Sequence, residues 1–293
     1  MIVTVTDDEP NILVVRHDLN EPGALPSGPL DPERDLTLDK AVRRWLALQT
    51  GVEVSYVEQL YTFGDRSRSA AIAGERELAV GYVALVAEEP PSEGSSWEPV
   101  YDLFPWEDHR FGQPDVLTGH LVPRLEEWAV GDDDRQARVQ ITFGIGTPWD
   151  PIRVLERYEL LHEAGLVHEH FMDQGDRVPD DVCGMAMAGD HRRIAATALG
   201  RLRGKLTYRP VIFEVMPEEF TLTELQRAVE AITGFGLHKQ NFRRLVDRGE
   251  LVEPTGGHRS STGGRPAALY RFRSDVASER PRPGFPLPHP KQL

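Results

Sequence analysis

A short run near residue 240 carries side chains that can read the edges of base pairs. It consists of His238, Lys239, Gln240 and Asn241, followed by Arg243 and Arg244. Asn and Gln can each make two hydrogen bonds to adenine, and Arg can do the same with guanine. The apolar residues Phe242, Leu245 and Val246 recur among them at helical spacing. The segment 239–248 therefore predicts a helix that presents amide and cationic groups on its outer face.

The flanking residues complete the pattern of a winged helix-turn-helix. Thr221 and Glu224 have the spacing of a capping box at the start of an apolar-faced helix, and Gly234 and Gly236 end that helix. After 239–248 come a strand that begins at Leu251, a loop rich in Gly and Ser, and a strand over 268–272. Two helices with a tight turn and a following hairpin form this fold, whose second helix enters the major groove of DNA.

The loop of the hairpin has the composition of a wing that contacts DNA. Its cations stand among glycines, and arginine is favoured where such a loop enters a minor groove. We therefore expect the DNA-binding residues to be His238, Lys239, Gln240, Asn241, Arg243, Arg244, Arg259, Ser260 and Arg265. Two alternatives remain open: a winged helix that contacts protein, and a surface helix with ordinary solvated charges.

The charge of the chain is distributed unevenly. The formal net charge of −14 by itself argues against nucleic acid, but from 239 to 273 the basic residues outnumber the acidic ones. A single cysteine excludes an intramolecular disulfide, and the first residues lack the basic start of a signal peptide. We expect a cytoplasmic protein without a membrane segment.

The N-terminal half indicates an α+β layer domain. It alternates strands at 12–15, 54–63 and 78–87 with a helix at 36–50. Residues 88–187 are expected to form a large insertion with its own structure, including a strand at 136–144 and a helix at 150–164. A helix at 191–206 and a short strand at 210–215 follow. The predicted domains are 1–205 for ligand sensing and 206–275 for DNA binding, with a Pro-rich, disordered tail at 276–293.

Several of these segments resemble one known family. The stretches KLTYRPVIFEVMPEEFTLTELQRAVEAITG, NFRRLVDRGELVEPTG and GGRPAALYRF, with ALPSGPLDPERDLTLDKAVRRWLALQTGV upstream, are similar to the Nudix-related transcriptional regulators of NAD metabolism. The resemblance implies a Nudix-like α/β/α sandwich with an inserted mixed region, followed by a C-terminal winged helix. The middle region near 88–187 is similar to a longer branch of repressors of NAD synthesis, whose effector is ATP.

The Nudix-like part departs from the pattern of a working hydrolase. In that pattern, paired glutamates on one helix hold Mg²⁺ against a pyrophosphate. With Arg44 and Gly51 as fixed points, the glutamate positions are occupied by Leu36, Trp45, Leu48 and Gln49, none of which is a carboxylate. We expect a domain that binds a nucleotide without hydrolysing it, and the resemblance implies a sensor for ADP-ribose or another adenine nucleotide.

The expected function is therefore a homodimeric repressor of NAD biosynthesis or salvage genes, controlled by ATP or ADP-ribose and with no required cofactor or metal. The candidate ligand-binding residues are Arg16, Arg44, Tyr61, Phe63 and Asp65, although Arg44 fits a structural cation equally well and the two aromatic residues fit a core. The main alternative is a Nudix-type pyrophosphatase that acts on ADP-ribose or a related nucleotide and takes its metal carboxylates from Glu33, Asp39 or the insertion. A third is a nucleotide-binding adaptor whose winged helix contacts protein.

Two other groups of residues could suggest a metal site or a nucleophile, but their sequence context argues against both. The segment 162–173 is dense in His, Glu and Asp, but Leu166 stands where the zinc-protease motif needs its second His. We interpret this segment as a solvated helix end. Cys183 has no basic partner nearby in the sequence, which argues against a nucleophilic role.

Overall fold

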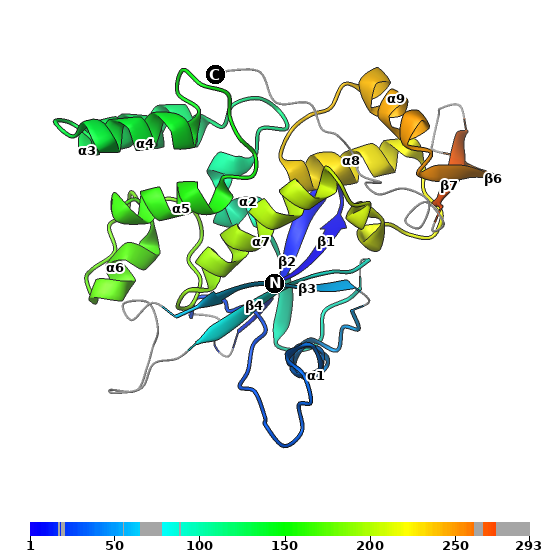
Figure 1. Ribbon diagram of the computed structural model, residues 1–293, viewed down its shortest axis with the longest axis horizontal. Helices are drawn as coiled ribbons and strands as arrows, with labels where there is room; N and C mark the ends of the chain where they lie inside the picture. Colours follow the sequence, from blue (N-terminus) through cyan, green and yellow to red (C-terminus); the bar gives the residue numbers. More distant parts are fainter. Residues whose placement is uncertain are drawn as a thin grey trace.

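The computed structural model describes residues 1–16, 18, 21–54, 56–64, 78–87, 89–260 and 266–273. Its centre is a five-stranded mixed sheet with the order β3-β4-β1-β2-β5 (Figure 1). Within the sheet β1 runs parallel to β4, and the other neighbours are antiparallel. The strands are β1 (Ile2–Thr6), β2 (Glu9–Val15), β3 (Tyr56–Phe63), β4 (Ala79–Leu85) and β5 (Ser95–Pro99).

Alternate residues of the central strands contribute their side chains to two separate apolar layers. Ile2 and Leu13 lie in the layer under helix α1 (Leu38–Thr50), whereas Val3 and Ile12 lie in the layer under α7 (His191–Leu206) and α8 (Leu222–Thr233). This follows from the two-residue period of a strand, which sends successive side chains to opposite faces. The result is the α/β/α sandwich that the sequence predicts.

The strand β1 was not predicted, and a tight turn explains how it enters the sheet. Asp7 and Asp8 both have left-handed backbone angles, with φ of 52° and 67°, and Thr6 pairs with Glu9 directly across them. A two-residue hairpin with positive φ at both central positions matches the twist of the strands that it joins. Asp tolerates this conformation better than most residues, so the hairpin could have been inferred from its turn.

The first helix, α1, begins two residues later than predicted. The Thr37 side chain accepts a hydrogen bond from the Lys40 N–H at 3.2 Å, which caps the helix, and Gly51 ends it with a φ of 68°. Since a cap residue lies outside the helix, Leu36 belongs to the preceding loop.

The middle region is mostly helical, and the predicted strand at 136–144 is wrong. These residues belong to α4, in which Val139, Thr142 and Phe143 are buried at helical spacing and Ile141 is half exposed. The Asp132 carboxylate caps the helix at the Arg135 N–H. The helices of this region are α2 (Val100–Leu103), η1 (Pro105–Glu107), η2 (Leu117–Leu121), α3 (Val122–Trp128), α4 (Asp133–Phe143), α5 (Val154–Glu163) and α6 (His168–Gln174).

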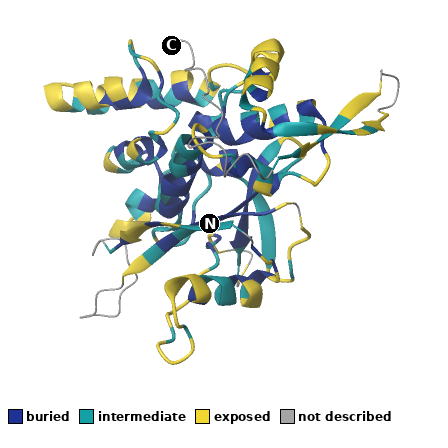
Figure 2. Cartoon of the chain, turned by 45° about the vertical axis from the view of Figure 1, so that its right-hand side comes forward, coloured by how far each residue is buried: buried dark blue, intermediate teal, exposed yellow. Residues whose placement is uncertain are grey.

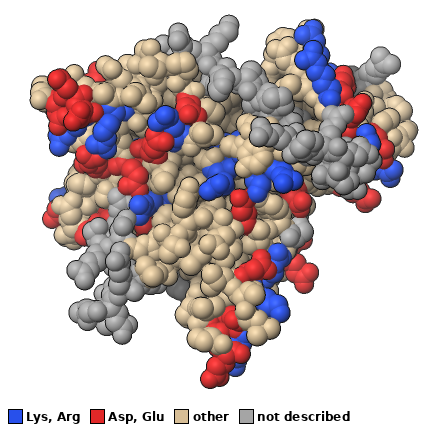
Figure 3. All heavy atoms as spheres, viewed as in Figure 1, with Lys and Arg blue, Asp and Glu red and all other residues tan. Residues whose placement is uncertain are grey.

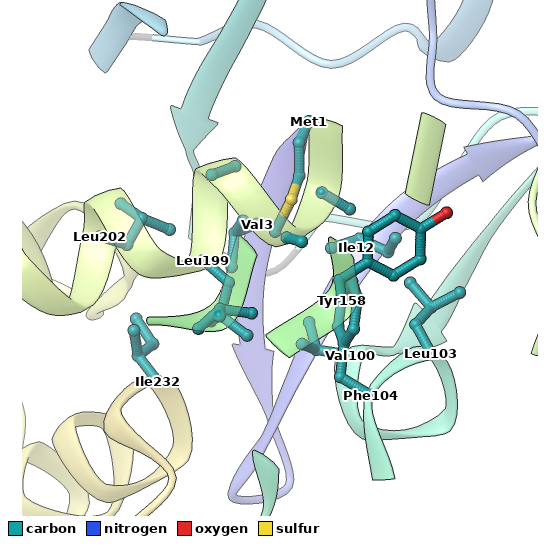
Figure 4. Close-up of a cluster of buried hydrophobic side chains, with 14 of the residues drawn as sticks. Met1, Val3, Ile12, Val100, Leu103, Phe104, Tyr158, Leu199, Leu202 and Ile232 are labelled. Carbon is teal, nitrogen blue, oxygen red and sulfur yellow. The ribbon is translucent and has the colours of Figure 1, made fainter. Parts of the chain in front are cut away.

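The middle region shares its core with the rest of the body. The strand β5 pairs with β2 and extends the sheet, so residues 95–99 belong to the sandwich. Figure 4 shows Val100 and Phe104 of the middle region close to Leu199 of α7 and Val3 of β1. Residues 88–187 thus contain helices that pack onto the sheet layer rather than standing apart from it, and their assignment as an insertion stays a prediction.

The C-terminal residues form a winged helix. It contains α8, α9 (Lys239–Gly249) and the hairpin of β6 (Val252–Arg259) and β7 (Ala267–Phe272). Phe220 exchanges two backbone hydrogen bonds with Tyr270, which adds a third extended segment to the hairpin. The segment 210–215, predicted as a strand, is instead the 3-10 helix η3 (Val211–Val215), because Ile212 and Val215 are buried three residues apart.

Two further sequence-based predictions concern the ends of the chain and the membrane. The Pro-rich tail at 276–293 lies outside the described residues, and the boundary at 205 stays a prediction. In the described ranges, no helix combines the length and the apolar character needed to cross a membrane.

The capping box of α8 gives a first test of the fold. The Thr221 side chain accepts from the Glu224 N–H at 3.2 Å, and the Glu224 carboxylate accepts from the Thr221 N–H at 2.8 Å. We expect Thr221→Ala to lower the free energy of unfolding by about 1 kcal/mol. The matched control is Thr223→Ala, an exposed position in the same turn. Urea unfolding that shows equal losses for the two variants would contradict this role of Thr221.

Candidate nucleic-acid interface and ligand pocket

The outer face of α9 is a row of polar side chains on a helix anchored from beneath. Phe242 and Val246 are each 1% exposed and pack into the core. The DNA-binding candidates on this helix and at its start are all exposed: His238, Lys239, Gln240, Asn241, Arg243 and Arg244. Figure 2 shows this outer face in the colour of exposed residues.

Three of the cations on α9 are available for an external anion. Among the described residues, Lys239, Arg243 and Arg244 take part in no ion pair. Figure 3 shows a row of basic side chains at the upper right, where α9 lies, and acidic side chains at the far left over the tip of α3 and α4. The acidic character of the whole chain therefore does not extend to this helix.

The direction of α9 is fixed by the turn that precedes it. The Glu230 carboxylate accepts from the Leu237 N–H at 2.6 Å, and the Gln226 amide donates to the Leu237 carbonyl at 2.8 Å. Both side chains belong to α8, so the first helix sets the starting point of the second. Neither residue was among the sequence-based candidates. Both bind the backbone of Leu237, and only the folded turn brings that backbone within reach of α8.

The wing residues have different surroundings. The Arg259 guanidinium pairs with the Glu224 carboxylate at 2.5 Å and donates to the Glu219 carbonyl at 3.2 Å. The pair is about half exposed, and such pairs contribute little net stability, so DNA phosphates can compete for Arg259. Ser260 is exposed at the end of β6, and Arg265 lies outside the described residues. These assignments stay predictions.

The winged helix is held against the body at the C-terminal end of α8. The Tyr101 hydroxyl donates to the Ala231 carbonyl at 2.5 Å, the Arg203 guanidinium donates to the Ile232 carbonyl at 3.0 Å, and the His109 N–H donates to the Gly234 carbonyl at 2.8 Å. The last carbonyls of a helix lack partners inside the helix. The body supplies three donors to them.

A buried carboxylate organises these donors. Glu107 is fully buried and pairs with Arg157 at 2.5 Å and with Arg203 at 2.5 Å, and both arginines are themselves at most 1% exposed. Burial would raise the pKa of Glu107, but the charges of Arg157 and Arg203 outweigh burial and hold the pKa below its ordinary value. Glu107 therefore stays ionised and keeps Arg203 directed at α8.

The close packing at Gly234 gives a matched test of this contact. A Cβ at Gly234 would lie 2.5 Å from the Glu107 carbonyl and 2.6 Å from the Arg203 guanidinium, whereas a Cβ at Gly175 would meet nothing within 4 Å. Both glycines end helices with similar positive φ. We expect Gly175→Ala to cost about 1–2 kcal/mol of stability, and Gly234→Ala to cost about 1–3 kcal/mol more because of the clash. Equal losses in urea unfolding would refute tight docking.

A pocket of about 520 Å³ lies between α1, the loop that precedes α1 and the start of β4. Its volume falls in the range of small-molecule sites, which are mainly apolar with a few polar groups. The described lining fits this, with Trp45, Leu38, Val80 and Ile194 among the apolar residues and Ser27, Tyr82 and His191 supplying polar atoms.

The loop of residues 25–30 forms the roof of the pocket, and hydrogen bonds hold this roof loop to α1. The Gln49 amide accepts from the Ser27 N–H and donates to the Ser27 carbonyl, both at 2.9 Å, and the Trp45 indole N–H donates to the Pro29 carbonyl at 2.9 Å. Gly28 lies directly on the indole ring, where a Cβ would come within 2.1 Å. Trp45 and Gln49, two of the aligned glutamate positions, thus hold a loop.

Of the predicted ligand-binding residues, the four that the structure describes are not in the described lining of the pocket. Arg16 pairs with Glu98 at 2.6 Å, and Arg44 pairs with Asp35 at 2.6 Å, which lowers the pKa of Asp35 to about 2 chiefly through the hydrogen bond. Tyr61 is exposed, with Arg201 over its ring.

Phe63 is 7% exposed and belongs to the core, and Asp65 lies outside the described residues. The five assignments of ligand-binding residues stay predictions. The lining residues at 25–30 were missed because the sequence marks them only as a Pro- and Gly-rich loop.

No group of three or more His, Cys, Asp or Glu side chains in the described part of the chain is arranged to hold a metal ion. In the His-rich segment, His162 pairs with Asp173 at 3.0 Å and His170 contacts Gln174 at 3.0 Å. Asp39 pairs with Arg43 at 2.9 Å on α1. Burial raises the pKa of the Cys183 thiol, which keeps it protonated.

Comparison with known proteins bears on both halves. Residues 212–272 match the family described as the NrtR DNA-binding winged helix domain. The ADPR responsive transcriptional repressor NtrR of Acinetobacter baylyi is 42% identical over 86 residues, which are 29% of this chain and 34% of that protein. The match thus spans about a third of the curated relative.

Two solved structures share the fold along the chain. NrtR of Shewanella oneidensis, solved in complex with a 27mer DNA, has 25% identity and a TM-score of 0.58 over 94% of this chain and 93% of its own. This coverage leaves 6% of the chain unmatched, so most of residues 88–187 have a counterpart there. A MutT/nudix family protein from Enterococcus faecalis shares the fold alone, with 17% identity and a TM-score of 0.52 over 93% of this chain and 83% of its own.

These comparisons confirm the resemblance that the sequence indicated. The chain combines a Nudix-like domain with a C-terminal winged helix that matches the NrtR DNA-binding domain, and its fold is similar to that of NrtR along most of its length.

Proposed function

We propose that this chain is a DNA-binding transcriptional repressor whose affinity for its operator depends on ADP-ribose. The observation that carries the proposal is the face of α9, where amides and unpaired cations stand together on the helix that a winged helix inserts into DNA. The match of residues 212–272 to the NrtR DNA-binding domain supports the same function, as does the similarity to the ADPR responsive transcriptional repressor of Acinetobacter baylyi. The proposed targets are genes of NAD biosynthesis or salvage.

The amide and guanidinium groups of α9 suit the major groove. In the proposal Gln240 and Asn241 contact base edges near the start of the helix, and Arg243 and Arg244 contact bases or phosphates along it. A homodimer would place two copies of α9 on half-sites of a symmetric operator.

Charge substitutions distinguish DNA contact from general attraction. We expect Arg244→Ala to weaken operator binding by at least about fivefold, and to reduce the slope of log K against log salt by about one if the contact is a phosphate. Arg135→Ala on α4 removes the same charge far from the interface and should leave the operator affinity unchanged. Fluorescence anisotropy on the promoter of the chain's own gene neighbourhood, across a salt series, measures both. Equal effects of the two variants would exclude specific contact through α9.

For the effector, the proposal assigns the pocket beside α1 to the nucleotide. A mainly apolar cavity with a few backbone and side-chain polar groups suits the base and ribose of ADP-ribose better than its phosphates. ATP is the alternative effector, since it shares the adenosine part. Because Trp45 and Gln49 hold the roof loop, we propose that binding proceeds without hydrolysis.

The Gln49 clamp gives a test of the pocket. We expect Gln49→Glu to weaken ADP-ribose binding by at least about fivefold, since a carboxylate cannot donate to the Ser27 carbonyl and the loop loses its fastening. Gln140→Glu, an exposed position on α4, makes the same change of charge away from the pocket. Calorimetric titration of ADP-ribose and of ATP gives the affinities. Mg²⁺-dependent turnover of ADP-ribose by the wild-type chain would contradict a non-hydrolytic sensor.

A further inference from the structure

Helix α7 connects the pocket to the place where the winged helix is held. Near its start, Ile194 lines the pocket, and the His191 ring accepts from the Leu25 N–H of the roof loop at 2.9 Å. Nine residues further on, Arg203 donates to the end of α8. At a rise of 1.5 Å per residue these two points are about 14 Å apart along one helix.

Tyr101, the second side chain that donates to the end of α8, is also linked to α7. Tyr101 belongs to α2, and the carbonyl of Leu103, at the end of α2, accepts from the buried Arg192 guanidinium of α7 at 3.1 Å. The two side chains that reach α8, Tyr101 and Arg203, thus take their positions from the same helix.

The carbonyls that they hold lie just before α9. Ala231 and Ile232 are in the last turn of α8, and Gly234 begins the turn that leads to Lys239. All three residues are buried, and Gly234 fits against the body without room for a methyl group. Because this packing leaves little free space, we expect a shift of α7 to displace the end of α8. Figure 4 shows Leu199 and Leu202 of α7 on the same side of the cluster as Ile232 of α8.

We propose that Tyr101 and Arg203 are positioning residues that set the angle of the DNA-reading helix according to the occupancy of the pocket, with α7 as the connecting element. The proposal rests on the proposed function, because it needs both DNA binding and an effector. Glu107 keeps Arg203 in place, and His109 adds a backbone donor to the same helix end. None of these residues needs to touch DNA or ligand.

The variant Tyr101→Phe removes a single hydroxyl and keeps the buried ring. The test measures the operator affinity of the full-length chain by fluorescence anisotropy, without and with saturating ADP-ribose. The ratio of the two dissociation constants is the coupling between the sites. We expect Tyr101→Phe to bring this ratio at least about fivefold closer to one. The matched control is Tyr158→Phe, a buried tyrosine of α5 in the same core, which should keep the wild-type ratio.

The outcomes separate the two proposals. If the operator affinity of the wild-type chain ignores ADP-ribose and ATP alike, the proposed function falls, and the positioning role falls with it. If the wild-type chain responds and Tyr101→Phe responds equally, the positioning role alone is overturned. A loss of coupling that Tyr158→Phe shares would also overturn it, because it would reflect general loosening of the core.

A second measurement uses the wild-type protein, so it does not depend on whether the Tyr101→Phe variant folds. The His109 N–H donates directly to the Gly234 carbonyl, so its hydrogen exchange reports the docking of α8. We expect saturating ADP-ribose to change the exchange rates of His109 and Leu237 by at least about fivefold, with little change at Arg138 on α4. Unchanged rates at His109 and Leu237, in a chain whose operator affinity responds to ADP-ribose, would refute the proposal.

Discussion

The buried charge of Glu107 is the constraint on which the arrangement of the two halves depends. A carboxylate with no exposure must be paired, because leaving it alone in an apolar interior is far costlier than any single packing defect. Arg157 and Arg203 meet that need from two different helices, α5 and α7, and both also donate to backbone carbonyls. The middle region, the helix over the sheet and the winged helix therefore meet at one point.

The contact around Glu107 also explains why the winged helix packs against the body instead of being joined to it only by the polypeptide chain. The hydrogen bonds from the body go to the end of α8, an ion pair joins Arg227 of α8 to Asp8 of the β1–β2 hairpin, and within the body Arg110 pairs with Glu9 of the same hairpin. The surface contacts are weak individually, whereas the buried ones have no water to replace them. The exposed face of α9 is left outside, where Lys239, Arg243 and Arg244 form no ion pair with other described residues.

Much of the local structure follows from residues that act at short range. Thr221 and Gly51 cap helices as the sequence predicts, and the two-residue alternation of β2 and β4 sends their successive side chains to opposite layers. The prediction of a strand at 136–144 failed because Val139, Ile141 and Phe143 alternate by chance. The helix there is decided by the Asp132 cap and by burial of Thr142, which depends on neighbours distant in the sequence.

The sequence by itself determined the expected kind of protein, because the signals for it are local patterns: helix α1 with no carboxylate at Trp45, Leu48 or Gln49, the capped helix pair, and the cationic run at 238–244. Only the tertiary structure decided which residues connect the halves and which line the pocket. Tyr101, Arg203 and Gln49 owe their roles to backbone atoms 130, 29 and 22 residues away along the chain. A hydrogen bond to a distant carbonyl leaves no mark in sequence spacing, because every residue has that carbonyl and only the fold brings one of them within reach.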